Sequence, residues 1–393
     1  MGKKLELVNQ LKVAFSEQFG DGEEVNVFFA PGRVNLIGEH TDYNGGHVFP
    51  CSLNIGTAAV VRKRADRRLR LYSTNFPEIG VREIDLGQLT NIKENDWANY
   101  PIGVADILQK QGYELAHGFD IAYSGNIPNG AGLSSSASIE MVTAVLFNDL
   151  LDLQIEMVEL VKFSQKAENE FIGVNSGIMD QFAIGMGKES KAILLDCNTL
   201  QYEYSPLELE EHILIIANTN KRRGLADSKY NERRAECEHA LAQLQEVVDI
   251  ASLGQLTAET FEQHKHVITN DIERKRAKHA VLENIRTIKA VKLLQAGDLA
   301  GFGELMNQSH ISLRDDYEVT GAELDALVEA AWEAGATGAR MTGAGFGGCT
   351  INLVKREDHQ EFIEQVGKAY TEATGLVADF YAVHVGDGAR RLS

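Results

Sequence analysis

The first segment whose side chains could do chemistry is residues 30–46, which read APGRVNLIGEHTDYNGG. It follows a strand-like run and brings Arg, Glu, His, Asp, Tyr and Asn close together along the chain. Carboxylates accept hydrogen bonds from hydroxyls, Arg and His donate them, and glycines let the backbone come near a ligand. The set suits a polyhydroxylated ligand such as a sugar, and the composition alone fits equally a polar surface loop with Asn-Gly as its turn.

A second segment, residues 125–138, reads GNIPNGAGLSSSAS and lies between a predicted strand and an apolar predicted helix. The start of a helix exposes unpaired N–H groups and a partial positive charge. Glycines let a phosphate touch the backbone there, and serine hydroxyls can cap the helix, hydrogen-bond the phosphate or reach a metal. We therefore predict a phosphate cradle, with a Gly/Ser connector and a capped helix as the alternative.

A third segment, residues 341–350, reads MTGAGFGGCT and contains the pattern G-x-G-x-x-G of dinucleotide-binding proteins. That pattern must follow a strand and open a helix, whereas this one leads into a strand-like run at 349–354, so we reject the dinucleotide interpretation. The segment could shape a cleft over a phosphate or form a tight turn. The P-loop pattern and the H-R-D and D-F-G signatures of protein kinases are absent, so a kinase would need another scaffold.

Regular elements must position these segments, and the periodicity of the sequence predicts where they lie. In the first half we expect helices at about 8–19, 97–111, 133–151 and 156–171, and strands at 25–30, 48–61, 69–76 and 118–124. In the second half we expect strands at 212–219, 349–354 and 378–385, helices at about 227–247, 274–295, 299–312, 321–334 and 357–374, and a glycine-rich hinge before residue 349. The strands are grouped rather than alternating with helices, which favours an α+β fold.

Length and composition limit the organisation and the partners. The 393 residues exceed what one hydrophobic core usually supports, so we expect two domains, 1–205 and 206–393, with a cleft between them. The net charge is 38 − 57 = −19, which repels nucleic acid and anionic lipid, so an anionic nucleotide would need local compensation. The four cysteines lack metal-ligand spacing and no apolar signal or spanning segment is found, so we expect reduced thiols and a cytoplasmic protein.

Taken together, the three segments resemble the three motifs of the GHMP small-molecule kinases, in the same order. The run GRVNLIGEHTDYN at 32–44 resembles the signature of one branch, the galactokinase family. The resemblance implies an N-terminal ribosomal-protein-S5-like domain and a C-terminal ferredoxin-like domain, both α+β, with the active site in the cleft between them. It also implies that the protein transfers the γ-phosphoryl group of MgATP to the anomeric C1 hydroxyl of α-D-galactose, giving galactose 1-phosphate and ADP, as the first step of galactose catabolism by the Leloir pathway.

The same resemblance implies partners and residue roles. The partners would be galactose and MgATP, with no nucleic acid and no membrane, and we expect a monomer. Sugar binding would fall to Glu39, His40, Thr41, Asp42 and Tyr230. ATP would contact Ser73, Gly130, Ala131, Gly132, Leu133, Ser134, Ser135 and Ser136. Mg²⁺ would be placed by Ser136 and Glu168, since magnesium takes hard oxygen ligands together with waters and phosphate.

Asp180 resembles the catalytic base of the family, and Arg33 resembles the cation beside it. A guanidinium next to the carboxylate favours its ionised form and can stabilise charge on the transferring phosphoryl group. An ionised Asp180 can then orient the sugar hydroxyl and accept its proton. Without the resemblance, Asp180 would be interpreted as a helix-capping or surface carboxylate and Glu168 as an exposed helix residue.

Two alternatives compete with this function. A related enzyme could act on N-acetylgalactosamine, mevalonate or homoserine, although residues 30–46 offer more hydroxyl-binding groups than the last two ligands need. The other alternative is a sensor that binds galactose and ATP without catalysis. Such sensors resemble the family but are damaged in the serine run of the phosphate loop, whereas residues 134–136, Asp180 and Arg33 are all intact here.

Overall fold

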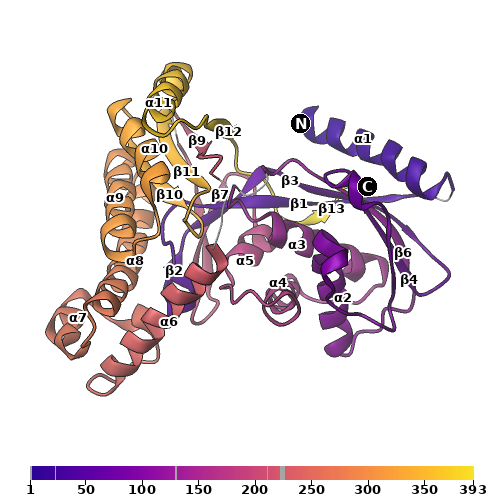
Figure 1. Cartoon of the computed structure of the whole chain (residues 1–393), viewed down its shortest axis with the longest axis horizontal. Helices are drawn as coiled ribbons and strands as arrows, with labels where there is room; N and C mark the ends of the chain where they lie inside the picture. Colours follow the sequence, from indigo (N-terminus) through magenta and orange to yellow (C-terminus); the bar gives the residue numbers. More distant parts are fainter. Residues whose placement is uncertain (1, 23, 129–130, 210, 222–225) are drawn as a thin grey trace.

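The structure is a computed structural model that describes residues 2–393 except 23, 129–130, 210 and 222–225. Among the described residues, a six-stranded sheet and a four-stranded sheet form the centres of two regions (Figure 1). The first region contains helices α1 (Gly2–Phe19), α2 (Asn99–Lys110), α3 (Ser135–Leu150), α4 (Met157–Lys166) and α5 (Met179–Met186). Its sheet contains strands β1 (Asn26–Asn35), β3 (Pro50–Lys63), β4 (Arg68–Ser73), β5 (Arg82–Asp85), β6 (Phe119–Gly125) and β13 (Arg390–Arg391).

The six-stranded sheet has apolar side chains on both faces, and helices cover both. Its strand order is β13-β1-β3-β6-β4-β5, with β4 and β6 parallel. Successive side chains of a strand point to opposite faces. Accordingly, Val27 and Phe29 of β1 pack in a cluster with α1, whereas Phe28 and Ala30 pack in the larger cluster with α2, α3, α4 and α5. Figure 1 shows α1 on one side of the sheet and the other helices on the opposite side.

The second region contains strands β9 (His212–Asn218), β10 (Gly338–Thr342), β11 (Cys349–Lys355) and β12 (Asp379–Val383). Its helices are α6 (Ala226–Gln245), α7 (Ala258–His264), α8 (Asp271–Gln295), α9 (Leu299–Ser312), α10 (Ala322–Glu333) and α11 (His359–Thr374). The sheet order is β10-β11-β9-β12, and the neighbouring strands are antiparallel. With helices between β9 and β10 and again between β11 and β12, this is the ferredoxin-like arrangement, and the predicted α+β class is confirmed.

The two regions share a core. One cluster of buried side chains joins Val34 and Leu36 of the first half to Leu214 and Ile351 of the second. A small third sheet of β2 (His47–Val48), β7 (Lys191–Asp196) and β8 (Tyr202–Pro206) precedes β9. The chain end then returns to the first region, where β13 pairs with β1. The predicted boundary at 205 therefore falls at the end of β8, although the last strand of the chain belongs to the first sheet.

Several elements differ from those that the sequence predicted. The sequence analysis did not predict helices α5 and α7 or strands β5, β7, β8, β10 and β13. Strand β1 extends to Asn35 and so includes the start of the first chemical segment. Helix α3 begins at Ser135 rather than near Leu133, because Ser134 has a left-handed backbone with φ 61°. All four cysteines are free, and three of them are buried. Among the described residues, no helix is both long enough and apolar enough to cross a membrane.

Candidate active site

A cavity of about 150 Å³ lies where the first chemical segment, helix α5 and the hairpin between β10 and β11 meet. Its lining includes Arg33, Glu39, His40, Asp42, Glu168, Asp180 and Tyr230 of the predicted site. Ser176, Gly177 and Ala344 also line it. The fold therefore brings together residues that are up to about three hundred positions apart in the sequence.

Arg33 and Asp180 form a two-pronged ion pair at the wall of this cavity. Arg33 Nε donates to Asp180 Oδ1 at 2.7 Å and Nη2 donates to Oδ2 at 2.8 Å, while Nη1 donates to the carbonyl of Gly132 at 2.8 Å. The Ser134 hydroxyl donates to Asp180 Oδ2. Burial alone would lower the pKa of Arg33, but Asp180 raises it above its usual value, so the guanidinium stays charged.

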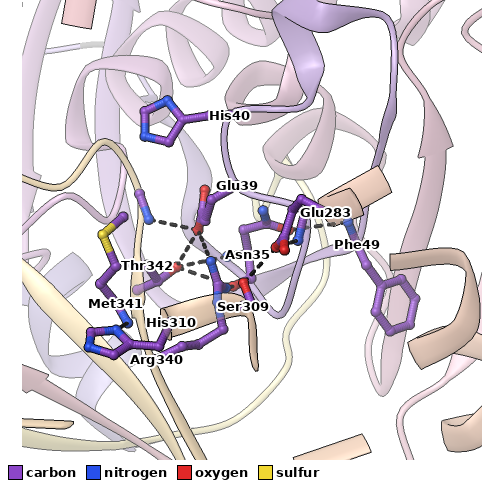
Figure 2. A network of polar contacts seen from close by, with 12 residues as sticks. Asn35, Glu39, His40, Phe49, Glu283, Ser309, His310, Arg340, Met341 and Thr342 are labelled. Atoms are coloured by element: carbon purple, nitrogen blue, oxygen red, sulfur yellow. Dashed lines mark hydrogen bonds and ion pairs between the residues drawn. The ribbon is translucent and has the colours of Figure 1, made fainter. Parts of the chain in front are cut away.

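Glu39 is buried, and its two carboxylate oxygens have different surroundings. Oε1 accepts hydrogen bonds from Gly343 N at 2.8 Å and Thr342 Oγ1 at 3.1 Å, and it forms an ion pair with Arg340 Nη2 at 3.2 Å. Figure 2 shows these contacts converging on one oxygen, while the other oxygen points away from them. Because Glu39 lines the cavity, the second oxygen can accept a hydrogen bond from a ligand.

His40 is buried and neutral. Burial lowers its pKa to about 3. Its Nε2 lies 3.2 Å from the carbonyl of Ala344, which can only accept, so Nε2 carries the proton. Nδ1 then accepts from the Tyr43 hydroxyl at 2.8 Å, and that hydroxyl lies 2.7 Å from the hydroxyl of Tyr317. Both ring nitrogens are thus engaged by the protein, and the imidazole joins the first segment to the third.

Asp42 and Tyr230 complete the predicted sugar-binding set that lines the cavity. Burial and the charge of Asp180 raise the pKa of Asp42 to about 7. Tyr230 comes from α6, and its hydroxyl contacts the backbone of Gly177. Thr41 differs from the other four predicted sugar-binding residues, because its hydroxyl is hydrogen-bonded to the carbonyls of Gly38 and His47 within its own loop. A contact of Thr41 with substrate stays a prediction.

A second cavity of about 450 Å³ opens beside the start of α3. Ser73, Ser135 and Ser136 of the predicted nucleotide site line it. Aromatic side chains that the sequence analysis did not single out line it as well, namely Phe76, Trp97, Tyr100 and Tyr123. None of the described residues that line it carries a positive charge. Flat aromatic walls next to a helix start are suited to a ligand with both a planar ring and an anionic part.

Glu168 and Ser136 connect the two cavities. Glu168 lines the first cavity, Ser136 lines the second, and the Ser136 hydroxyl hydrogen-bonds the Glu168 carboxylate. Ser176 Oγ and Gln181 Nε2 each donate to Glu168 Oε2 at 2.8 Å, which fixes its orientation. Burial and the nearby Asp180 raise the pKa of Glu168, so the carboxylate lies where a cation would stabilise its charge.

The rest of the predicted phosphate loop contributes backbone more than side chains. Gly130 lies outside the described residues. Ala131 and Leu133 are buried in the shared core, and the Leu133 carbonyl accepts from Arg33 N at 3.2 Å. Gly132 has φ 75° and supplies the carbonyl that Arg33 contacts. The left-handed backbone of Ser134 turns its hydroxyl toward Asp180 instead of capping α3.

The third chemical segment is the hairpin loop between β10 and β11. No helix follows it, so the rejection of a dinucleotide fold agrees with the structure. Gly343 has φ 87°, and a Cβ there would lie 2.9 Å from the carbonyl of Gly132, so the loop packs against the phosphate loop. Its backbone, through Gly343 and Ala344, forms part of the first cavity. The loop therefore shapes the site between the two regions.

The sequence analysis missed two groups of lining residues, for different reasons. Trp97 and Tyr100 lie at the start of the predicted helix 97–111, where they fitted a helical pattern and gave no sign of a ligand. Asp96 beside them has an unusual backbone, with φ 50°, which no sequence pattern announces. Residues 174–178 precede the short helix α5, whose eight residues are too few for a clear periodicity.

Comparison with known proteins places this chain among one set of relatives. The galactokinase galactose-binding signature matches residues 13–63, the GHMP kinase N-terminal domain matches 99–188, and the GHMP kinase C-terminal domain matches 290–372. A galactokinase of Clostridium beijerinckii is 58% identical over 389 residues, which is 99% of this chain and 100% of that protein.

Solved structures give the same result at two levels of similarity. The crystal structure of Lactococcus lactis galactokinase complexed with galactose has a TM-score of 0.96 and 52% identity, covering 98% of this chain and 100% of that one. The structure of Methanococcus jannaschii mevalonate kinase has a TM-score of 0.65 at 20% identity, covering 93% and 99% of the two chains, and so resembles this chain in fold alone.

Proposed function

The chain belongs to the galactokinase family of the GHMP kinases, and on this premise we propose that its first cavity binds galactose and its second cavity binds ATP. The reaction of the family transfers the γ-phosphoryl group of ATP to the anomeric C1 hydroxyl of α-D-galactose and yields galactose 1-phosphate and ADP. The observation that carries the assignment is the position of Asp180. It lines the first cavity, pairs with Arg33 and accepts a hydrogen bond from Ser134 at the end of the phosphate loop.

Asp180 acts in this proposal as the general base. Among the described residues, Oδ2 has two donors, whereas Oδ1 has only Arg33 Nε, so Oδ1 retains room for a sugar hydroxyl. The hydroxyl donates to Oδ1 and passes its proton there as its oxygen bonds to phosphorus. Arg33 balances the carboxylate charge and lies near enough to stabilise charge that develops on the phosphoryl group.

The sugar is held by acceptors around it. The free oxygen of Glu39 and the carboxylate of Asp42 accept from sugar hydroxyls, and the Tyr230 hydroxyl contributes from the opposite region. His40 supports this arrangement through the hydrogen bonds that fix its ring. These groups are close together and largely removed from water, so each bond discriminates against a sugar that lacks the matching hydroxyl.

ATP occupies the second cavity in this proposal, with its phosphates at the start of α3. Ser73 and the aromatic side chains line the far part, and Ser135 and Ser136 line the part next to the phosphate loop. Because no described residue that lines this cavity is cationic, in this proposal the phosphate charge is balanced by the helix start, by Arg33 and by a divalent cation.

Ser136 and Glu168 would hold Mg²⁺, since one hydroxyl and one carboxylate suffice when phosphates and waters supply the remaining ligands. The raised pKa of Glu168 supports this choice, because a nearby cation favours the ionised carboxylate. When bound, the ion neutralises charge on the phosphates. A cytoplasmic location, as expected from the sequence, stays part of the proposal.

A phosphorylation assay tests this function directly. The protein is incubated with ATP and Mg²⁺ and with galactose, glucose, N-acetylgalactosamine or mevalonate, ADP release is measured, and NMR establishes which oxygen is phosphorylated. We expect galactose to have the highest kcat/KM and the phosphate to be on C1. Faster phosphorylation of N-acetylgalactosamine or mevalonate would overturn the substrate assignment, and binding of galactose and ATP without ADP release would support the sensor alternative.

A further inference from the structure

Arg340 is a fully buried charged side chain behind the proposed sugar site. It lies in the middle of β10, in the second region, and its guanidinium reaches across to the first region. Nη1 donates to the carbonyl of Asn35, at the end of β1, at 2.8 Å. Nη2 lies 3.2 Å from Oε1 of Glu39. Figure 2 shows the guanidinium between these two partners, behind the carboxylate as seen from His40.

The contacts of Arg340 decide which oxygen of Glu39 faces the cavity. Oε1 is taken by Arg340 and by the next residues of the same chain segment, Thr342 Oγ1 and Gly343 N. The Arg340 contact is an ion pair without the alignment of a hydrogen bond, so its effect is mainly that of a positive charge held in place. The carboxylate is therefore anchored on one side and has its other oxygen available to a ligand.

The loop that carries Glu39 is fixed by the same cluster of buried charges. Gly38 N donates to Glu283 Oε1 at 3.0 Å, and Ser309 Oγ donates to the same oxygen at 2.6 Å. Burial would raise the pKa of Glu283, but Arg286, His279 and Arg340 together lower it to about 2. Arg340 is thus a positive charge near two buried carboxylates, and a buried charge that loses its partner is strongly disfavoured.

We propose that Arg340 is a positioning residue for the sugar: it sets the orientation of the Glu39 carboxylate, and thereby the affinity for the one hydroxyl that Glu39 accepts from. It does not touch the sugar, because it lies on the far side of Glu39 and does not line the cavity. This inference rests on the proposed contact between Glu39 and galactose. It assigns part of the specificity of the sugar site to a strand of the second region.

The test compares Arg340→Lys, Glu39→Gln and the double variant by steady-state kinetics with galactose and with ATP as the varied substrate. Lysine keeps the charge, but its single ammonium cannot reach both Asn35 and Glu39 as the guanidinium fork does. We expect Arg340→Lys to raise KM for galactose about tenfold or more, the scale of a hydrogen bond to a charged group, and to change KM for ATP less than about twofold. In the Glu39→Gln background, Arg340→Lys should raise KM for galactose by less than a further factor of about two, because Arg340 acts through Glu39.

A second measurement separates positioning from general destabilisation. Galactose analogues that each lack one hydroxyl identify the hydroxyl that Glu39 binds. Removal of that hydroxyl should raise KM in the wild type but not in Glu39→Gln. Arg340→Lys should lose discrimination at that same hydroxyl and keep it at the others. The matched control is Arg276→Lys, another buried arginine of the second region, which pairs with Glu236 and Glu318 away from the cavity. We expect it to lower the melting temperature and to leave KM for galactose unchanged.

The outcomes separate this inference from the proposed function. If Glu39→Gln leaves KM for galactose unchanged, the proposed sugar contact is wrong. If Glu39→Gln raises KM for galactose but Arg340→Lys does not, only the positioning role of Arg340 is wrong. The same holds if the increase in KM of the double variant equals the product of the increases of the two single variants. Should Arg340→Lys fail to fold, Thr342→Val removes a neutral donor to the same oxygen. A change of discrimination at the same hydroxyl in that variant supports the inference, and unchanged discrimination contradicts it.

Discussion

At the scale of single residues, the carboxylates of the first cavity differ in what already holds them. Asp180 is paired with Arg33, Glu39 is anchored through one oxygen, and Asp42 lies close to Asp180 without an ion pair of its own among the described residues. Glu168 is hydrogen-bonded by Ser136, which lines the second cavity. In the proposed mechanism, these differences suit each carboxylate to a separate role, although all four have the same functional group.

Replacement of Asp180 should remove the proposed base and leave the proposed sugar site in place. We expect Asp180→Ala to lower kcat at least about 10²-fold, the usual effect of losing a general base, with a smaller change in KM for galactose. Stopped assays of galactose 1-phosphate formation measure this, and circular dichroism checks that the variant is folded. Near wild-type turnover in a folded Asp180→Ala protein would remove this residue from the mechanism.

The protonation of Asp42 should appear in the pH dependence of sugar use. Its pKa is raised to about 7, so the carboxyl group is protonated below that pH and becomes a full acceptor above it. We therefore expect kcat/KM for galactose to rise as the pH increases through about 7. Profiles of the wild type and of Asp42→Asn provide the measurement, and the variant should lack this inflection. Identical profile shapes for the two proteins would contradict the assignment.

At the scale of elements, the site depends on how short segments meet. Strand β10 is at the edge of its sheet, and helix α9 covers that edge: Asn307 Oδ1 accepts from Ala339 N at 2.9 Å, and His310 Nδ1 accepts from Met341 N at 3.3 Å. Alternate backbone N–H groups of a strand point the same way, so two side chains of one helix are enough to accept hydrogen bonds from the exposed edge of β10. This pairing fixes the strand that carries Arg340 and leads into Gly343.

The turn before α5 is equally constrained, at Gly177. A Cβ there would lie 1.8 Å from Asp42 Oδ2, so a larger residue must displace that carboxylate. We expect Gly177→Ala to lower kcat/KM for galactose about tenfold to a hundredfold, since a shift of about 1 Å in a substrate-positioning group has effects on this scale. The free energy of unfolding should change by less than about 1 kcal/mol, because only the end of one side chain has to move.

Gly367→Ala provides the matched control for this substitution. Gly367 lies within α11, where a Cβ would make ordinary contact with Phe380 at 3.4 Å. That variant should keep its galactose kinetics and gain slightly in stability, because alanine is the better helix former. Unchanged galactose kinetics in Gly177→Ala would mean that the position of Asp42 is not critical.

For the molecule as a whole, the last residues of the chain return from the second region to the first. Ala389 N donates to the carbonyl of Ile184 at 2.8 Å, at the end of α5, and Leu392 N donates to the carbonyl of Val27 at 2.7 Å, in β1. Helix α5 carries Asp180 and strand β1 carries Arg33. The last residues therefore connect to both elements that hold the ion pair, although they follow the entire second region.

Removal of residues 388–393 should weaken that connection. The deletion eliminates several backbone hydrogen bonds, each worth about 1 kcal/mol net, so we expect the free energy of unfolding to fall by about 2–4 kcal/mol and kcat to fall as well. Thermal melts and kinetics measure both effects. Arg391→Ala is the control, because its ion pair with Asp149 is exposed and should contribute less than about 1 kcal/mol. A deletion variant with unchanged stability would show that the tail is dispensable.

Local patterns along the chain were enough to predict the kind of chemistry and the long helices. These patterns are local: the order of side chains in residues 30–46, the Gly/Ser run before α3 and the periodicity of the long helices. A local pattern involves residues that are close together in the sequence, so it can be read without the fold. They were sufficient for the α+β class, which the structure confirms, and for the kinase family, which the comparisons confirm. The two roles for which the residues alone were ambiguous, those of Asp180 and Glu168, rest on the resemblance and stay predictions.

Which groups meet, and how each is held, follows from the packing of the whole chain. Arg340 follows Glu39 by about three hundred positions, and no local pattern distinguishes it from a surface arginine until β10 brings it behind the sugar site. The aromatic wall of the second cavity, the occupied nitrogens of His40 and the raised pKa of Asp42 likewise arise from burial and from charges on other elements. Burial and long-range contacts are properties of the packed chain, and they set the electrostatics of the site.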